Sequence, residues 1–392
     1  MKKFWKLGAC ASAALVFASG AWAHEVPTTL GSATAYGFLQ LNGVYDITPQ
    51  SPGTWYTNLA RQPADSKPRG GAYLTARNSR LGLKGKFPDG ETSFLLEADF
   101  HGNNNENVTR PVASTAFRLR HAYVESGSWL FGQAWSNAFD AGASLESVDT
   151  SSQLTSGGVR QAQVRYTTDL SPQAKFSLSL ENPAVYPASA NTSQAATVTT
   201  ATATATASSR TPDIVLRATH TADWGHLSAI ALTHDYVFDN GISTRSNTGG
   251  LMGLSGSFKL ANDKLVYGVY RGAGAGRYQW GTTYQAAFDD GNQVQTFKSS
   301  SYHYGYTHKW NDKVRTNFNR SYVLFDDQVV PALKSLENQV NNKRLSQYQI
   351  NTFVALNKSV EAGAEWAYGK RDGQDKSVSH EQRVNFSLTA RF

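Results

Sequence analysis

Hydrophobic and polar residues alternate along much of this chain, and the alternation predicts β-strands. In residues 91–101 the even positions are mostly apolar, among them Phe94 and Leu96, whereas the odd positions include Glu97 and Asp99. A period of two places these two sets on opposite faces of one strand. Residues 381–392 repeat the pattern up to the terminus. Strands with one apolar and one charged face are typical of the wall of a transmembrane β-barrel.

The same pattern recurs often enough to close a barrel. We expect an all-β fold, a transmembrane antiparallel barrel of about 16 strands, an even number as bacterial barrels require. The predicted strands are 34–47, 72–86, 91–103, 115–126, 128–135, 159–168, 174–182, 213–222, 225–238, 249–261, 264–273, 296–310, 312–325, 344–356, 359–370 and 381–392.

The connections between these strands alternate in length. Tight turns are expected at 88–90, 126–128, 223–225, 261–263 and 310–312, and long loops at 48–71, 102–114, 136–158, 183–212, 274–295 and 326–343. Short periplasmic turns and long extracellular loops are typical of outer-membrane barrels. Tyr and Trp residues near the predicted strand ends favour a membrane-interface girdle over sugar-stacking platforms.

The first 23 residues have the pattern of a cleaved secretory signal peptide. Lys2, Lys3 and Lys6 precede an apolar run, and Ala21-Trp22-Ala23 supplies a cleavage site. The run is shorter than the roughly 20 residues of a membrane-spanning helix, which disfavours an N-terminal anchor. Residues 24–392 are then a single porin barrel domain, exported to the outer membrane of a Gram-negative bacterium.

Removal of this segment changes the chemistry that the rest of the chain can perform. The one cysteine, Cys10, lies within it, so the mature chain has neither a disulfide nor a cysteine-ligated metal; a lipoprotein site at Cys10 is disfavoured because the apolar run continues past it. The formal net charge falls from +7 to +4, which removes the main support for nucleic-acid binding. No cofactor is expected.

One long loop, 183–212, contains a low-complexity stretch at 197–207 that consists almost wholly of Thr and Ala. It has no charge and no aromatic residue. We expect a mobile surface insertion; the alternative is an adhesive or antigenic tip.

Several sequence motifs resemble the DcaP-like family of outer-membrane porins. They are Asn78-Ser79-Arg80-Leu81-Gly82-Leu83-Lys84-Gly85, Glu97-Ala98-Asp99-Phe100, Leu119-Arg120-His121-Ala122-Tyr123-Val124, Gly132-Gln133-Ala134-Trp135-Ser136, Tyr304-Gly305-Tyr306-Thr307-His308-Lys309-Trp310 and Gly363-Ala364-Glu365-Trp366-Ala367-Tyr368-Gly369, with the terminal Phe392. The resemblance implies a homotrimer that passes small, preferentially anionic solutes such as dicarboxylates. Some relatives carry an N-terminal coiled coil, whereas here about ten residues separate His24 from the first predicted strand.

Residues 136–158 follow the fifth predicted strand, the position from which general porins fold a loop into the pore. We interpret this segment as a constriction loop that carries Asp140, Glu146 and Asp149. Nearby strands offer cations that would form a facing wall: Arg80, Lys84, Arg118, Arg120, Arg160 and Arg165. Arginine and lysine rings favour anions in narrow pores. The alternative is that these arginines pair with Glu97 and Asp99 and brace the barrel.

Other functions find less support in the sequence. The motif G-A-G-A-G-R at 272–277 lacks the frame of a phosphate-binding loop, and His220, His226 and His234 lack metal-ligand spacing. No G-x-S-x-G nucleophile motif occurs. A passive porin is therefore preferred over an adhesion or structural barrel, and over an enzyme. The expected partners are small anionic or hydrophilic solutes, outer-membrane lipids and the barrel assembly machinery, which would recognise the ending at Phe392.

Overall fold

The computed structural model describes most of the chain after its N-terminal segment. The described residues are 24–28, 31–48, 71–102, 116–149, 154–155, 158–184, 197–199, 204–239, 241–282, 285–326 and 342–392. The predicted signal peptide at 1–23 lies outside them, as do residues 49–70, 103–115, 185–196 and 327–341 of the predicted long loops.

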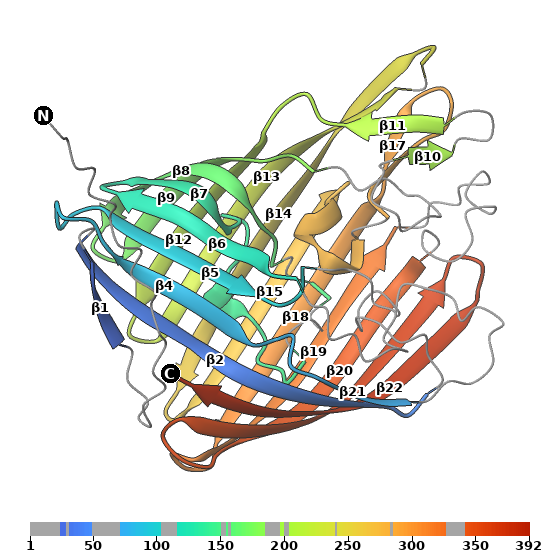
Figure 1. Cartoon of the computed structure of the whole chain (residues 1–392). Helices are drawn as coiled ribbons and strands as arrows, with labels where there is room; N and C mark the ends of the chain where they lie inside the picture. Colours follow the sequence, from blue (N-terminus) through green and yellow to red (C-terminus); the bar gives the residue numbers. More distant parts are fainter. Residues whose placement is uncertain are drawn as a thin grey trace, which may run out of the picture.

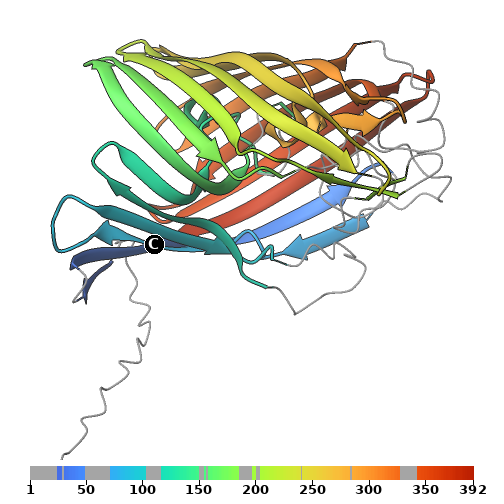
Figure 2. The ribbon, with the colours of Figure 1, turned by 90° about the horizontal axis from the view of Figure 1, so that it is seen from above.

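In the described part of the chain, sixteen antiparallel strands form a closed barrel around one interior (Figures 1 and 2). Pairing of the first strand with the last, β2 with β22, closes the barrel. The sixteen are β2 (Gly31–Asp46), β4 (Arg80–Lys86), β5 (Ser93–Asp99), β6 (Arg118–Ser126), β7 (Trp129–Trp135), β8 (Arg160–Ser171), β9 (Ala174–Glu181), β12 (Asp213–Ala222), β13 (Gly225–Asp239), β14 (Thr244–Leu260), β15 (Asp263–Ala273), β18 (Lys298–Lys309), β19 (Val314–Phe325), β20 (Asn342–Ala355), β21 (Val360–Gly373) and β22 (Val378–Arg391). The predicted fold class and strand number are confirmed.

Along each strand the apolar residues face outward from the barrel, and the polar residues face its interior. On β5, Leu96 is 49% exposed, whereas its neighbour Glu97 is 6% exposed. On β22, Phe386 is 53% exposed and Asn385 is 2% exposed. The apolar outer face suits lipid, and the polar inner face is buried by what fills the lumen.

The closing seam is the least regular part of the wall. The first half of β2 pairs with β4 and with the short strand β1 (His24–Thr28), and its second half pairs with β3 (Gly71–Thr75) and β22. The predicted strand 72–86 is thus two strands, separated by a turn in which the Ser79 N–H donates to the carbonyl of Ala76. Across this gap the Gln40 N–H donates to the Ser79 hydroxyl at 3.0 Å, so a side chain replaces the missing backbone partner.

One further expectation about connections is corrected by the structure. Residues 24–28 pair with β2, so less unpaired chain precedes the first strand than predicted. Within the Thr/Ala stretch, β10 (Thr197–Thr199) pairs with β11 (Thr204–Ser208), and β11 pairs with β13. Threonine is β-branched and favours such extended backbone. That the stretch is a surface insertion stays a prediction.

The terminal residue Phe392 completes the seam: its N–H and its carbonyl each exchange a hydrogen bond of 3.1 Å with Gly37 of β2. We predict that deletion of Phe392 lowers the amount of folded barrel in the outer membrane, measured by heat-modifiable migration in gels. Phe386→Leu, a change on the lipid-facing side of the same strand, is the matched control and should assemble normally.

Refolding of the truncated chain in detergent separates two causes of such a loss. If the chain refolds normally but assembles poorly in cells, Phe392 acts as a recognition signal for the assembly machinery. Normal assembly in cells at equal expression would show that the C-terminal phenylalanine carries no such signal.

Candidate functional site

The connection between β7 and β8 lies inside the barrel, against the inward faces of strands β9 to β22. It begins at Asn137, whose N–H donates to the Glu181 carboxylate of β9 at 2.8 Å and whose amide group donates to the Val215 carbonyl of β12 at 3.3 Å. From there it runs through the short 3-10 helix η1 (Ala141–Ala143). We call residues 136–149 the inward loop.

Asp140 anchors the inward loop to three strands at once. Its carboxylate lies 3.0 Å from the Arg217 guanidinium of β12 and 2.9 Å from His226 Nε2 of β13, and it accepts a 2.7 Å hydrogen bond from the Ser255 hydroxyl of β14. Burial alone raises the pKa of this carboxyl, but the hydrogen bond from His226 and the charge of Arg217 outweigh burial and hold the pKa well below its ordinary value. Asp140 is therefore ionised at neutral and mildly acidic pH.

Glu146 anchors the middle of the inward loop. The Arg315 guanidinium of β19 approaches its carboxylate to 2.6 Å and also binds Glu361 of β21 at 2.7 Å. The Glu146 carbonyl accepts hydrogen bonds from the side-chain amides of Asn319 and Asn351, at 2.6 and 2.9 Å. One glutamate thus joins the loop to strands β19, β20 and, through the arginine, β21.

A buried glutamate of the wall holds the last described turn of the inward loop. The Val148 N–H donates to the Glu365 carboxylate of β21 at 3.0 Å, and Asp149 lies 3.7 Å from the Arg383 guanidinium of β22. Between these anchors, His303 Nε2 of β18 donates to the Ala143 carbonyl at 2.9 Å. The loop is therefore attached along a path that crosses the wall from β9 to β22.

These contacts change the expected role of the three loop carboxylates. Asp140, Glu146 and Asp149 do not face the cations Arg80, Lys84, Arg118, Arg120, Arg160 and Arg165, as the sequence suggested; each is paired with a different cation on the wall behind the loop. For the buried Asp140 the physical reason is the cost of an unpaired buried charge; the half-exposed Glu146 is held by the paired donors of Arg315.

A second segment turns into the lumen between β15 and β18. The glycines of the motif at 272–277 allow this turn, because Gly274 and Gly276 have positive φ angles of 65° and 54°. They place Arg277 of the 3-10 helix η2 (Gly276–Tyr278) 2.7 Å from the Asp213 carboxylate and 2.9 Å from the Gln161 side-chain oxygen. The stretch predicted as part of a surface loop at 274–295 therefore starts as a lumenal plug. The 3-10 helix η3 (Trp280–Thr282) and the hairpin of β16 (Ala287–Asp289) with β17 (Val294–Thr296) complete the connection.

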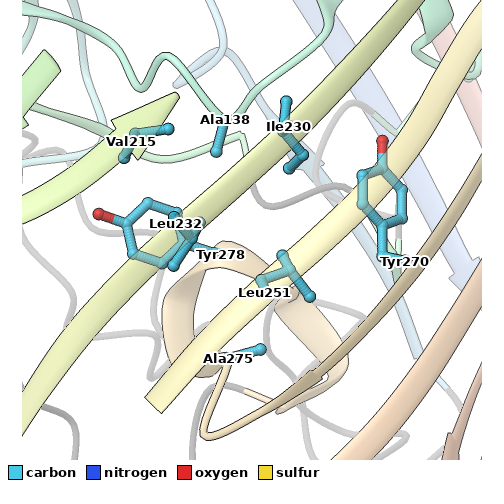
Figure 3. Packing of buried hydrophobic residues seen from close by; sticks show 8 residues of the cluster. All are labelled: Ala138, Val215, Ile230, Leu232, Leu251, Tyr270, Ala275 and Tyr278. Carbon is cyan, nitrogen blue, oxygen red and sulfur yellow. The ribbon is translucent and has the colours of Figure 1, made fainter. Parts of the chain in front are cut away.

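The two inward segments share an apolar core with the wall, shown in Figure 3. Ala138 of the inward loop and Tyr278 of η2 pack over inward-facing side chains of β12 to β15. The buried members are Ala138, Val215, Ile230, Leu232, Leu251, Tyr270, Ala275 and Tyr278. This part of the inner wall is apolar because loops cover it, and burial of its side chains adds to the polar anchors.

The opposite side of the lumen, formed by β4 to β6, carries an arginine cluster around two carboxylates. Arg120 binds both Glu97 and Asp99, each at 2.7 Å, and all three side chains are less than a tenth exposed. Arg118 binds Asp99 through two nitrogens, at 2.9 and 2.5 Å, and its side chain is 42% exposed. Arg80 lies 3.5 Å from Glu97. Three guanidinium groups thus share two carboxylates.

A bulge in β6 produces this arrangement. Opposite β5 the register moves from His121 to Leu119, so Arg120 has no residue directly across from it. A bulge re-aims the extra side chain, and here it brings Arg120 between Glu97 and Asp99. The ion pairs with Glu97 and Asp99 that the alternative expected are thus present for Arg118 and Arg120; that they brace the barrel stays a prediction.

The remaining predicted cations have no carboxylate within ion-pair distance among the described residues. Lys84 faces inward and lies 5.3 Å from the centre of the Tyr36 ring. Arg165 also faces inward, paired in register with the buried Leu130 of β7. Arg160 pairs in register with Trp135; its guanidinium lies 4.1 Å from the Trp135 ring and near the charges of Arg118 and Arg120.

Sequence reasoning missed the wall residues that hold the inward segments. They are Glu181, Asp213, Arg217, His226, His303, Arg315, Glu365 and Arg383. The period-two pattern marks those on strands as inward, but nothing in it says which loop residue each one meets.

The described residues contain neither a metal-binding cluster nor a membrane-spanning helix. Nowhere in them do three or more His, Cys, Asp or Glu side chains gather as a metal ion would require. They contain no apolar helix of membrane-spanning length.

Several proteins of known structure share this fold. In structure the chain is similar to the outer membrane channel DcaP of Acinetobacter baumannii, at 22% identity and a TM-score of 0.78, over 94% of this chain and 99% of that one. It is also similar to an anion-selective porin from Comamonas acidovorans (14%, 0.55, covering 92% and 99%) and to the trimer form of OmpT, an outer membrane protein of Vibrio cholerae (12%, 0.55, covering 93% and 100%).

At these identities the structural likeness shows the fold alone, and no curated protein sequence matches the chain. The family model for the DcaP outer membrane protein, however, matches residues 36–392, nearly all of the described barrel. The chain therefore belongs to the DcaP outer membrane protein family and forms an outer-membrane channel.

Proposed function

We propose that this barrel is a passive channel that favours small anionic solutes, dicarboxylates among them, over cations. The observation that carries the proposal is the arginine cluster of β4 to β6, in which three guanidinium groups share the carboxylates of Glu97 and Asp99. Lys84 and Arg165 add inward-facing positive charge on neighbouring strands.

An excess of positive charge on one side of a narrow lumen attracts anions that are not in contact with the charged residues. Walls of low dielectric constant focus the field and raise the local concentration of anions. A guanidinium group also offers paired donors that match a carboxylate. The half-exposed Arg118 presents such donors to the lumen while Asp99 holds it in place.

The inward loop supports selectivity by removing competing negative charge. Asp140 and Glu146 are neutralised by Arg217 and Arg315 on the wall behind the loop. Asp140 and Glu146 therefore add little negative charge to the lumen beside the arginine cluster.

The contacts of the buried histidines favour a channel over an enzyme. His226 lies between the Ser257 hydroxyl, at 2.9 Å from Nδ1, and Asp140, at 2.9 Å from Nε2, a residue set that hydrolases use. Here Asp140 is also bound by Arg217 and Ser255, and Ser257 is 7% exposed. A nucleophile so enclosed cannot meet a substrate, which supports a structural role in tethering the loop.

We also propose a homotrimer. The family resemblance implies this state, and the similar Vibrio cholerae protein has a form described as a trimer.

Reversal potentials of single channels in a KCl gradient test the proposed selectivity, and we expect the sign for anion preference. Arg165→Gln should shift the potential toward cations with little change in thermal stability, because Arg165 has no ion-pair partner among the described residues. Arg120→Gln is the comparison variant: it leaves Glu97 and Asp99 short of a donor, and should cost about 3 kcal/mol or more of stability. Cation preference in the wild-type channel would overturn the proposal.

A separate prediction concerns the Asp140 anchor. Asp140→Asn leaves Arg217 and His226 without their carboxylate, so we expect a loss of about 3 to 5 kcal/mol in the free energy of unfolding and noisier, larger single-channel currents. Asp169→Asn, which breaks an exposed pair with Lys175, is the control and should change stability by less than about 1 kcal/mol.

The pH dependence of the wild type checks the same anchor. Because the pKa of Asp140 is lowered in the folded state, its stabilisation is present above the ordinary carboxyl pKa and is lost only as pH falls through the lowered value. Conductance should therefore be steady down to about pH 5. An unchanged unfolding free energy in Asp140→Asn would contradict the anchoring role.

A further inference from the structure

A pocket on the outside of the barrel carries positive charge where the wall should meet lipid. It has a volume of about 530 Å³ and lies over β19, β20 and β21; its lining residues are Arg320, Tyr322, Leu324, Arg344, Ser346, Tyr348, Tyr368 and Lys370. All of them are even-numbered and point away from the lumen, on the same face as Phe318 and Trp366, which are 49% and 40% exposed. The pocket thus continues the lipid-facing surface.

The pairing register arranges the pocket in rows across the three strands. Arg320 lies opposite Tyr348, and Tyr348 lies opposite Tyr368. The next row toward the long-loop end joins Tyr322, Ser346 and Lys370, and the row beyond it joins Leu324, Arg344 and Asp372. The cations therefore lie between an apolar band and the long-loop end of the wall, at the height of a membrane interface.

Charge in the pocket is not balanced within the described residues. Asp372 binds Arg344 at 2.7 Å and Lys370 at 2.9 Å, so one carboxylate serves two cations. Arg320 has no carboxylate within ion-pair distance there; its guanidinium lies 4.1 Å from the Tyr348 ring and 5.6 Å from the Tyr322 ring. Stacking on tyrosine fixes the guanidinium plane, and no side chain or carbonyl among the described residues accepts from its N–H donors.

An outward-facing arginine without an anion is costly at a lipid boundary. The cost is removed if a lipid supplies the anion, and basic pockets on membrane proteins bind lipid headgroups in this way. In an outer membrane the long-loop end faces the outer leaflet, whose glycolipids carry phosphates on a sugar headgroup. The tyrosine rings beside the cations suit such a sugar.

We propose that Arg320, Arg344 and Lys370 bind a phosphate group of an outer-leaflet glycolipid on the outside of the barrel. The guanidinium groups offer paired donors to phosphate oxygens, and Asp372 positions Arg344 and Lys370 for the same ligand. The site is separate from the lumen and does not depend on the selectivity of the channel.

Native mass spectrometry of the detergent-solubilised chain tests the proposal, with bisphosphorylated lipid A and its dephosphorylated form as probes. The wild type should bind the phosphorylated lipid and should not bind the dephosphorylated form. The double variant Arg320→Gln with Lys370→Gln should weaken binding of the phosphorylated lipid by about 30-fold. Near a charged lipid surface, the loss of each cation weakens binding by about tenfold or less. The control is Lys259→Gln, which removes an exposed cation at the short-turn end and should bind as the wild type does.

Each other outcome overturns the proposal. Equal binding of the two lipids by the wild type excludes a phosphate site, even if the double variant fails to fold. Displacement of the lipid by excess inorganic phosphate would indicate a site for the free ion. The native mass also reports the number of subunits, so a double variant that loses its oligomer but keeps its lipid would make this face a subunit contact instead.

Discussion

The need to pair buried charge governs the interior of this barrel. A carboxylate enclosed in the lumen is costly unless a cation and hydrogen-bond donors meet it, and the wall meets Asp140 with Arg217 and Glu146 with Arg315. These contacts fix the path of the inward loop across the strands from β9 to β22. The path in turn decides which inner surfaces are covered and which stay open to solutes.

Ion pairing also determines where positive charge exceeds negative charge. Because wall cations behind the loop neutralise the loop carboxylates, the arginine cluster around Glu97 and Asp99 keeps its excess positive charge. The same reasoning applies outside the barrel, where Asp372 serves two cations and Arg320 has only tyrosine rings beside it among the described residues. In both places we infer that an anion from outside the chain meets the unmatched cation.

The barrel was predictable from sequence because period-two patterning is local: residues 381–392 reveal their two faces without reference to any other strand. The site was only partly predictable. The inward loop was predictable from its position after the fifth strand. The partners of Asp140 were not, because they depend on strand register, which the pattern of one strand does not determine. The bulge that aims Arg120 at two carboxylates is also a consequence of register.

The central claim, that the inward loop lies fixed against the wall, can be measured with one engineered disulfide. A Cβ atom at Gly305 would meet the Leu145 Cδ2 atom at 2.7 Å, so the two positions are in contact and Leu145→Cys with Gly305→Cys is the pair to test. With residues 1–23 removed, the chain has no other cysteine. We predict that the bond forms in the folded barrel on mild oxidation and leaves the conductance unchanged. Free thiols after oxidation, or a conductance that changes when the bond closes, would contradict a fixed loop.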